Sequence, residues 1–132
     1  LYKSATGRAF AAFYRSPFLR TMLDDELREV AATTRIAVTA IRRQLEKTLA
    51  DIRRHGISRA TGSLTPGING FSAPVHEHTG AMVAAVTSLG TAGEFNVEWD
   101  CPVAKAMLAA AGTLSTRLGY KGADGRSESA RA

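Results

Sequence analysis

The apolar positions of residues 39–55 repeat with the period of an α-helix. Four of them fall at i, i+4, i+8 and i+11 and so share one helix face: Ile41, Leu45, Leu49 and Ile52. Thr39 is a suitable N-cap, and Gly56 stands where a left-handed residue commonly ends a helix. Most of the remaining surface is charged. We therefore predict an amphipathic helix over 39–55 that packs its apolar face on a larger body.

Two shorter helices are predicted upstream. The alanine-rich run at 9–13 has no β-branched residue and favours helix. Ser16-Pro17 interrupts it, because proline disfavours helix at the preceding residue and lacks an N–H. Residues 24–30 open with carboxylates, which favour the positive end of a helix dipole, so a short helix is predicted there.

After Gly56 the pattern changes to short apolar runs separated by turn residues. Residues 57–60 predict a strand, and Pro66-Gly67 predicts a turn. The runs 68–75 and 82–89 are joined by His-Glu-His-Thr-Gly at 76–80, which predicts a hairpin.

A last helix is predicted from Pro102 to about Leu118, because proline is favoured in a first turn. Its apolar positions are Val103, Met107, Leu108, Ala111 and Leu114. Residues 122–132 carry no large apolar side chain and are expected to form a disordered tail. Helices, a β-meander and a closing helix predict an α+β fold with helices packed against an antiparallel sheet.

Composition places the chain among ordinary globular domains. Its 132 residues suit one domain, with 45% hydrophobic and 22% charged residues. The sequence shows no signal peptide and no apolar run of membrane-spanning length, and its one cysteine fits a reducing cytoplasm, which we expect as its location.

The net charge of +5 permits DNA binding. Because the basic residues are scattered rather than interleaved with aromatics, a solvated surface is the favoured interpretation.

The residues do not assemble a catalytic constellation, so an enzyme is not expected. His76 and His78 could share a metal, but no third ligand is identifiable and a solvated turn is the favoured interpretation. Cys101 precedes a proline at a predicted helix start, where a thiol can be activated, although a lone cysteine is more often a small buried hydrophobe. The glycine-rich stretches match no phosphate- or dinucleotide-binding pattern. We expect neither a metal nor a cofactor.

Several segments, in this order, resemble a family of bacterial transcription regulators. Residues 1–12 read LYKSATGRAFAA, which is similar to "L-H-A-T-A-x-G-K-A-x-L-A". The long predicted helix ends RRHGI at 53–57, like the junction "R-x-R-G-Y". Residues 66–75 read PGINGFSAPV, close to "x-G-x-x-C-I-A-A-P-V", and 84–90 read AAVTSLG, close to "A-A-x-S-x-S-G". Their order and spacing resemble the C-terminal effector-binding domain of the IclR family.

The resemblance implies a GAF-like antiparallel sheet that binds a small organic molecule on one face, here over residues 1–121. It also implies a DNA-binding winged helix-turn-helix domain and assembly into homodimers or homotetramers. Neither that domain nor the strands that open the family's sheet is found in the sequence, so the chain is expected to be part of a regulator. Missing strands would leave apolar surface and an unpaired sheet edge.

The resemblance also carries over an effector pocket. Its residues would be Ala5, Thr6, Gly7, Ala60, Gly70, Thr87 and Leu89. The first three precede a predicted helix, whose free N–H groups can bind a carboxylate. Where the family commonly has acidic, Cys, Ser and Ser residues, this chain has Ala60, Gly70, Thr87 and Leu89. This lining suits a bulkier or more apolar organic acid than a two- or three-carbon one. The alternative is a dimerisation or interaction module that has lost its ligand.

Overall fold

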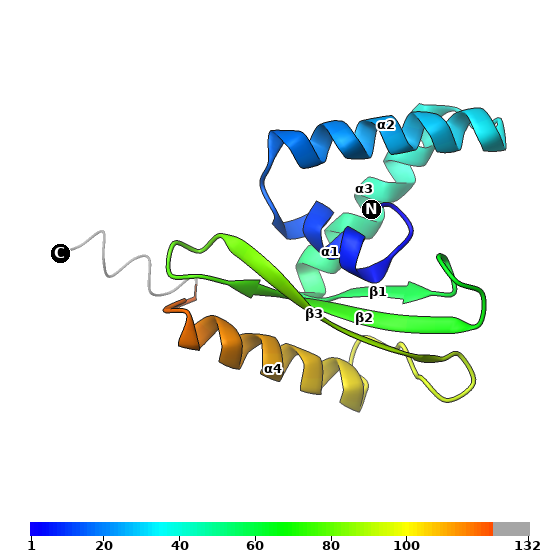
Figure 1. Cartoon of the computed structure of the whole chain (residues 1–132). Helices are drawn as coiled ribbons and strands as arrows, with labels where there is room; N and C mark the ends of the chain where they lie inside the picture. The colour runs from blue at the N-terminus through cyan, green and yellow to red at the C-terminus, as the bar shows by residue number, and fades with distance from the viewer. Residues whose placement is uncertain (123–132) are drawn as a thin grey trace.

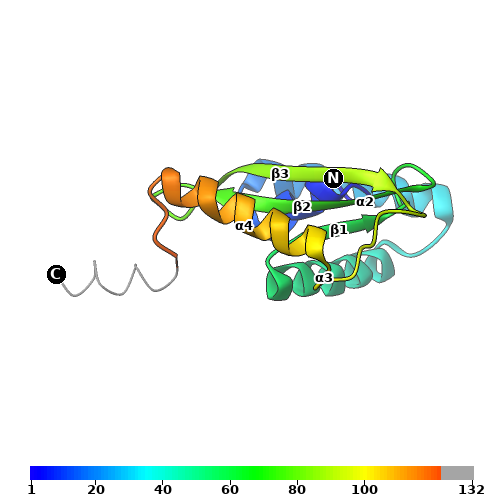
Figure 2. The same ribbon diagram turned by 90° about the horizontal axis from the view of Figure 1, so that it is seen from below.

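The computed structural model describes residues 1–122 and has three layers (Figure 1). The elements, in chain order, are α1 (Ala5–Phe13), α2 (Pro17–Thr34), α3 (Val38–His55), β1 (Ser58–Thr61), β2 (Ile68–His76), β3 (Met82–Thr91) and α4 (Pro102–Arg117). Helix α4 covers one face of the sheet and α1 the other; α2 lies beyond α1, and α3 runs beside α1 from α2 to the sheet (Figures 1 and 2). The α+β prediction is confirmed. None of the helices within residues 1–122 combines the length and the apolar character needed to cross a bilayer.

The described sheet is antiparallel, with strand order β1-β2-β3. Its strands lie within one or two residues of the predicted runs. The turn between β2 and β3 is closed by the Glu77 N–H, which donates to the Ala81 carbonyl at 2.9 Å, and Gly80 there has a φ of 83°. A register irregularity at Val75/His76 precedes this turn. Pro66 and Gly67 lie in the predicted turn before β2.

The predicted phase of the long helix is confirmed. Its buried residues are Ile41, Leu45, Leu49 and Ile52. They form a cluster with Leu27 of α2. Gly56 ends the helix with a φ of 74°, as predicted. The predicted N-cap was wrong: α3 begins at Val38 after Ala37, with no side-chain cap, and Thr39 lies inside the first turn.

Helix α2 is much longer than the segment predicted at 24–30. Pro17 occupies its first turn, where the missing N–H costs nothing. Ser16 accepts a hydrogen bond from the Leu19 N–H at 3.4 Å, so it caps the helix. Helix α1 ends at Phe13, before the predicted Ser-Pro break, and the Ser-Pro pair begins α2.

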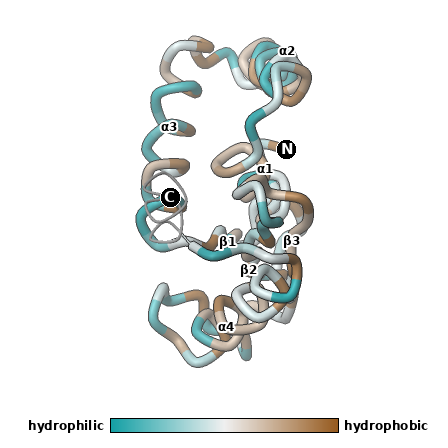
Figure 3. Tube along the Cα trace, turned by 90° about the vertical axis from the view of Figure 1, so that its left-hand side faces the viewer, coloured by the Kyte–Doolittle hydropathy of each residue, from teal (hydrophilic) through white to brown (hydrophobic). Residues whose placement is uncertain are grey.

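The second core lies between the sheet and α4. Its buried members are Ile57, Phe71, Ala73, Val75, Cys101, Ala104, Met107 and Ala111. Helix α4 turns small residues and Met107 towards β2, which brings the helix close to the sheet. Leu108 and Leu114, two of the apolar positions named for the predicted helix, are 37% and 42% exposed. Figure 3 shows apolar and polar residues mixed around α4, while teal segments mark the outer surface of α3. Apart from Gly122, the predicted tail at 122–132 lies outside the described residues.

Candidate functional site

The first turn of α1 presents backbone donors beside the sheet. Ser4 is the N-cap, and its hydroxyl accepts from the Gly7 N–H at 2.9 Å. Ala5, Thr6 and Gly7 therefore form the first helical turn rather than a loop before it. The first N–H groups of a helix have no intrahelical acceptor. Because Ser4 already satisfies Gly7, the free donors of this turn are the N–H groups of Ala5 and Thr6.

A chain of hydroxyl groups links this turn to the sheet. The Thr6 and Thr87 hydroxyl oxygens lie 2.8 Å apart, and Thr87 lies 2.9 Å from the Ser72 hydroxyl. Thr87 faces Ser72 across the strand pair, and Ser72 faces Ser58. The Ser58 hydroxyl is fully buried and has no hydrogen-bond partner among the described residues. Buried hydroxyls without a partner are uncommon, so this row marks a polar strip under α1.

The remaining predicted residues form the next cross-strand row. Ala60 faces Gly70, and Gly70 faces Leu89. A side chain alternates faces along a strand, so this row shares the α1 face with Ser72 and Thr87. A Cβ at Gly70 would lie 2.5 Å from Leu89 Cδ2, which shows that Leu89 leans across Gly70. Leu89 is itself 66% exposed. All the predicted pocket residues thus lie in α1 or on the sheet face that α1 covers, but the Leu89 side chain occupies the space over Gly70.

Residue-by-residue prediction missed Ser72 and Ser58. Both lie two residues from a predicted pocket residue on the same strand, so strand alternation alone was a sufficient signal. The loop after β1 was also missed: the Ser63 hydroxyl donates to the Lys3 carbonyl at 2.6 Å and ties this loop to the segment before α1.

The two histidines considered for metal binding have different surroundings. His76 ends β2, where its ring stacks on Tyr120 at 5.0 Å and meets Phe13 edge-on. His78 is exposed in the following turn. Within residues 1–122, no cluster of three His, Cys, Asp or Glu side chains could hold a metal ion.

Cys101 is buried at the start of α4. Its sulfur accepts from the Ala104 N–H at 3.5 Å and its thiol donates to the Asn96 carbonyl at 3.4 Å. The side chain also packs in the core between sheet and helix. Cys101 therefore serves as a helix cap and a core residue.

Known proteins match this chain in sequence and in fold. The family model for the bacterial transcriptional regulator IclR C-terminal domain matches residues 1–116. The uncharacterized HTH-type transcriptional regulator RhmR of Escherichia coli K12 is 29% identical over 121 residues, which cover 92% of this chain and 45% of RhmR.

Solved structures also match this chain. Pseudomonas aeruginosa HmgR is 34% identical, with a TM-score of 0.74 over 90% of this chain and 45% of HmgR. Thermotoga maritima IclR shares the fold, with a TM-score of 0.64 at 22% identity over 90% of this chain and 47% of that one. The chain spans less than half the length of these relatives. From the family match and these likenesses together, the chain belongs to the IclR family of bacterial transcriptional regulators and corresponds to its C-terminal domain.

Proposed function

We propose that this chain is the ligand-sensing part of a longer IclR-type regulator and is not an enzyme. A small organic acid binds between the first turn of α1 and β3. Its binding biases an N-terminal winged helix-turn-helix domain of the longer protein towards or away from DNA, within a homodimer or homotetramer. The observation that carries the proposal is the hydroxyl chain from Thr6 to Thr87 and Ser72, beside free helix N–H groups.

The acid group would bind at the positive end of α1. The Ala5 and Thr6 N–H groups are free to donate, and the helix dipole favours an anion there. The hydroxyl chain adds one further donor. Three hydroxyl groups carry three hydrogens, and the two bonds between them use two, so one hydrogen remains. When Thr6 and Ser72 both donate to Thr87, the Thr87 hydroxyl is the free donor.

The rest of the ligand would contact Leu89, whose apolar side chain is exposed, and would lie over the cross-strand row that contains the buried Ala60. Leu89 leans across Gly70, so a ligand must turn this side chain aside. Because Leu89 is largely exposed, its rotation meets little resistance. A ligand regulates DNA binding only if its affinity differs between two arrangements of the protein. Movement of α1 or of Leu89 on binding would supply that difference.

Substitution of Thr87 by valine tests this site. Valine keeps the shape of threonine and breaks the hydroxyl chain, so binding of an organic acid should weaken by about 1.5–3 kcal/mol, or roughly 10- to 150-fold. Calorimetric titration with a panel of aliphatic and aromatic carboxylates measures this loss. Thr113→Val on α4 is the matched control, because its hydroxyl bonds only within that helix and should leave affinity unchanged. Equal affinities of wild type and Thr87→Val would remove Thr87 from the site.

A dimerisation module without a ligand is the second candidate. The position of Leu89 over Gly70 favours it, because this side chain fills the space a ligand would use. Apolar side chains are also exposed on α2, where Phe18 is 74% and Met22 44% exposed. If no carboxylate binds and analytical ultracentrifugation still shows a stable dimer that Phe18→Ser dissociates, this candidate replaces the first.

A further inference from the structure

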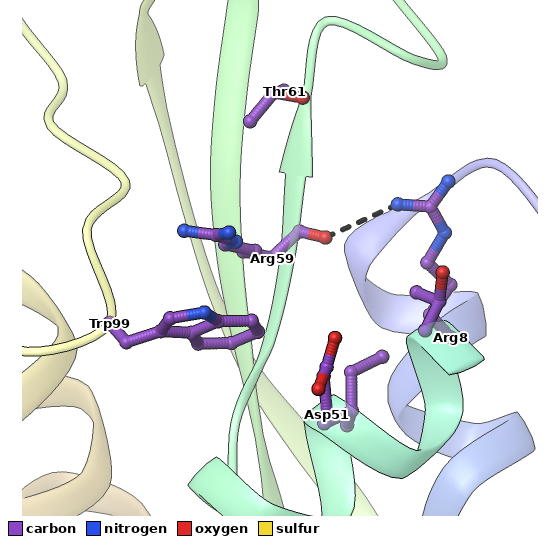
Figure 4. Close-up of a pocket in the computed structure, with 7 residues that line it drawn as sticks. Arg8, Asp51, Arg59, Thr61 and Trp99 are labelled. Atoms are coloured by element: carbon purple, nitrogen blue, oxygen red, sulfur yellow. Dashed lines mark hydrogen bonds between the residues drawn. The ribbon is translucent and has the colours of Figure 1, made fainter.

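A cleft lies around the edge of β1 that pairs with no other strand of the described structure, away from the ligand site proposed between α1 and β3 (the α1-face pocket). Its volume is about 200 Å³. Its lining residues are Arg8, Thr48, Asp51, Ile52, Arg59, Thr61 and Trp99 (Figure 4). They come from α1, α3, β1 and the segment before α4. Arg59 and Thr61 alternate with Ser58 and Ala60 along β1, so their side chains leave the strand on the other side from the pocket residues.

Arg59 is held rigidly on one side of this cleft. Its guanidinium carbon lies 4.1 Å from the centre of the Trp99 ring, and its Nη1 donates to the Val97 carbonyl at 2.7 Å. Trp99 also stacks on His55, with ring centres 4.2 Å apart and planes 6° apart. Cation–π contact and stacking fix the guanidinium before any ligand arrives.

Arg8 lies on another side, as Figure 4 shows. Its Nε donates to the Tyr2 carbonyl at 2.8 Å and its Nη1 to the Arg59 carbonyl at 3.4 Å. Both acceptors are neutral, and a guanidinium has five N–H groups, so most of its donors remain free. Burial lowers the pKa of Arg8 from its ordinary value, and a nearby Tyr2 partly offsets this. The charge is thus partly desolvated, and no ion pair among residues 1–122 compensates it.

The positive charge of the cleft is not neutralised within the described part of the chain. Neither Arg8 nor Arg59 belongs to an ion pair there. Asp51 is the carboxylate that lines the cleft, and it pairs with Arg54 at 3.0 Å. Two arginine residues therefore line the cleft against one carboxylate that already has a partner.

We propose that this cleft binds a small organic anion with two acidic groups, one for each guanidinium, independently of the α1-face pocket. In Figure 4 the Arg59 side chain extends over Trp99 on one side of β1, and Arg8 lies on the other side of that strand, so a ligand that meets both guanidinium groups must be extended across the edge of β1. Dicarboxylates such as succinate and glutarate carry an acidic group at each end of a short flexible chain and therefore serve as probes. The Thr61 hydroxyl, exposed at the rim, offers a further polar contact.

The single tryptophan of the chain reports directly on this cleft. Titration of Trp99 fluorescence in the 132-residue chain with succinate, glutarate, acetate and inorganic phosphate tests the proposal. Succinate or glutarate should give a saturable change and bind at least about tenfold more tightly than acetate, because a second ionic contact is worth about 1.4 kcal/mol or more. No saturation by either dicarboxylate, or saturation by phosphate alone, overturns the proposal.

Two variants that each remove one carboxylate distinguish binding in this cleft from an effect of the overall charge of the protein. Asp51→Asn removes the like charge beside the ligand and should strengthen dicarboxylate binding by about 3- to 10-fold. Glu46→Gln makes the same charge change on the exposed surface of α3, away from the cleft, and should change nothing. Equal effects of the two variants overturn the proposal. Both replace exposed carboxylates, so neither should prevent folding.

A third pair of variants separates the cleft from the α1-face pocket. Arg59→Gln should abolish the dicarboxylate response, and Thr87→Val should leave it unchanged. Loss of the response in Thr87→Val would place the ligand in the α1-face pocket and overturn the proposal. If Arg59→Gln fails to fold, Asp51→Asn against Glu46→Gln still decides the outcome.

Discussion

Leu45→Ala tests the packing of α3 on α2. Leu45 is 2% exposed and lies in the cluster with Leu27, Ile41, Leu49 and Ile52. Removal of a buried leucine side chain loses about 1.5–3 kcal/mol of transfer free energy, and the cavity left behind adds to this. The expected total is about 2–5 kcal/mol. We expect a value near 3 kcal/mol, because α2 can settle partly onto the smaller side chain.

Urea denaturation followed by circular dichroism measures this loss. With a slope of about 1.5 kcal/mol per molar urea, the midpoint should fall by roughly 2 M. Arg43→Ala is the control: Arg43 is exposed on the same helix, and its loss should cost no more than about 0.5 kcal/mol. Equal midpoint shifts for the two variants would show that the helical face is wrongly assigned.

Three further predictions concern caps and DNA. Ser4→Ala removes the cap that accepts from the Gly7 N–H and should lower the unfolding free energy by about 1 kcal/mol, whereas Ser4→Asp, which can still accept, should retain most of it. Gly56→Ala forces a side chain into a backbone with a φ of 74° and should cost about 1–2 kcal/mol by thermal denaturation; an unchanged melting temperature would contradict the left-handed cap. In gel shifts, the chain alone should bind DNA only without sequence preference and lose that binding as salt rises, so a preference that persists at physiological salt would refute this.

Sequence patterns predicted α3 well and α4 less well for one physical reason. Helix α3 alternates apolar and charged positions, so only one face can be buried. In α4 nearly every position is apolar or small, and the pattern does not select a face. Close packing on β2 selected Ala104, Ala111 and Ser115, and left Leu108 and Leu114 outside. The buried face, which also includes Met107, was therefore selected by packing on β2 and not by the hydropathy pattern of the helix.

The candidate site could also be predicted only in part from the sequence. Resemblance placed Thr87 and Gly70 on one sheet face, and the strand register agrees with it. The hydroxyl bonds from Thr6 to Thr87 depend on how α1 lies across the sheet, which no local pattern contains. The edge cleft was not predicted at all, because Arg8, Arg59 and Trp99 are far apart in the sequence and meet only in the fold.

The edge position of β3 has a consequence for handling the isolated chain. This strand runs from Met82 to Thr91 with neither a charged residue nor a proline, and Val83 is 48% exposed on it. Natural edge strands commonly carry lysine, proline or a bulge that prevents pairing with another molecule. The register irregularity leaves Val83 unpaired at the start of β3, but the uncharged residues 84–91 that follow still offer an open template for strand addition within the described part of the chain. We therefore expect the isolated chain to aggregate as its concentration rises, and a lysine in place of Val83 to keep it in solution.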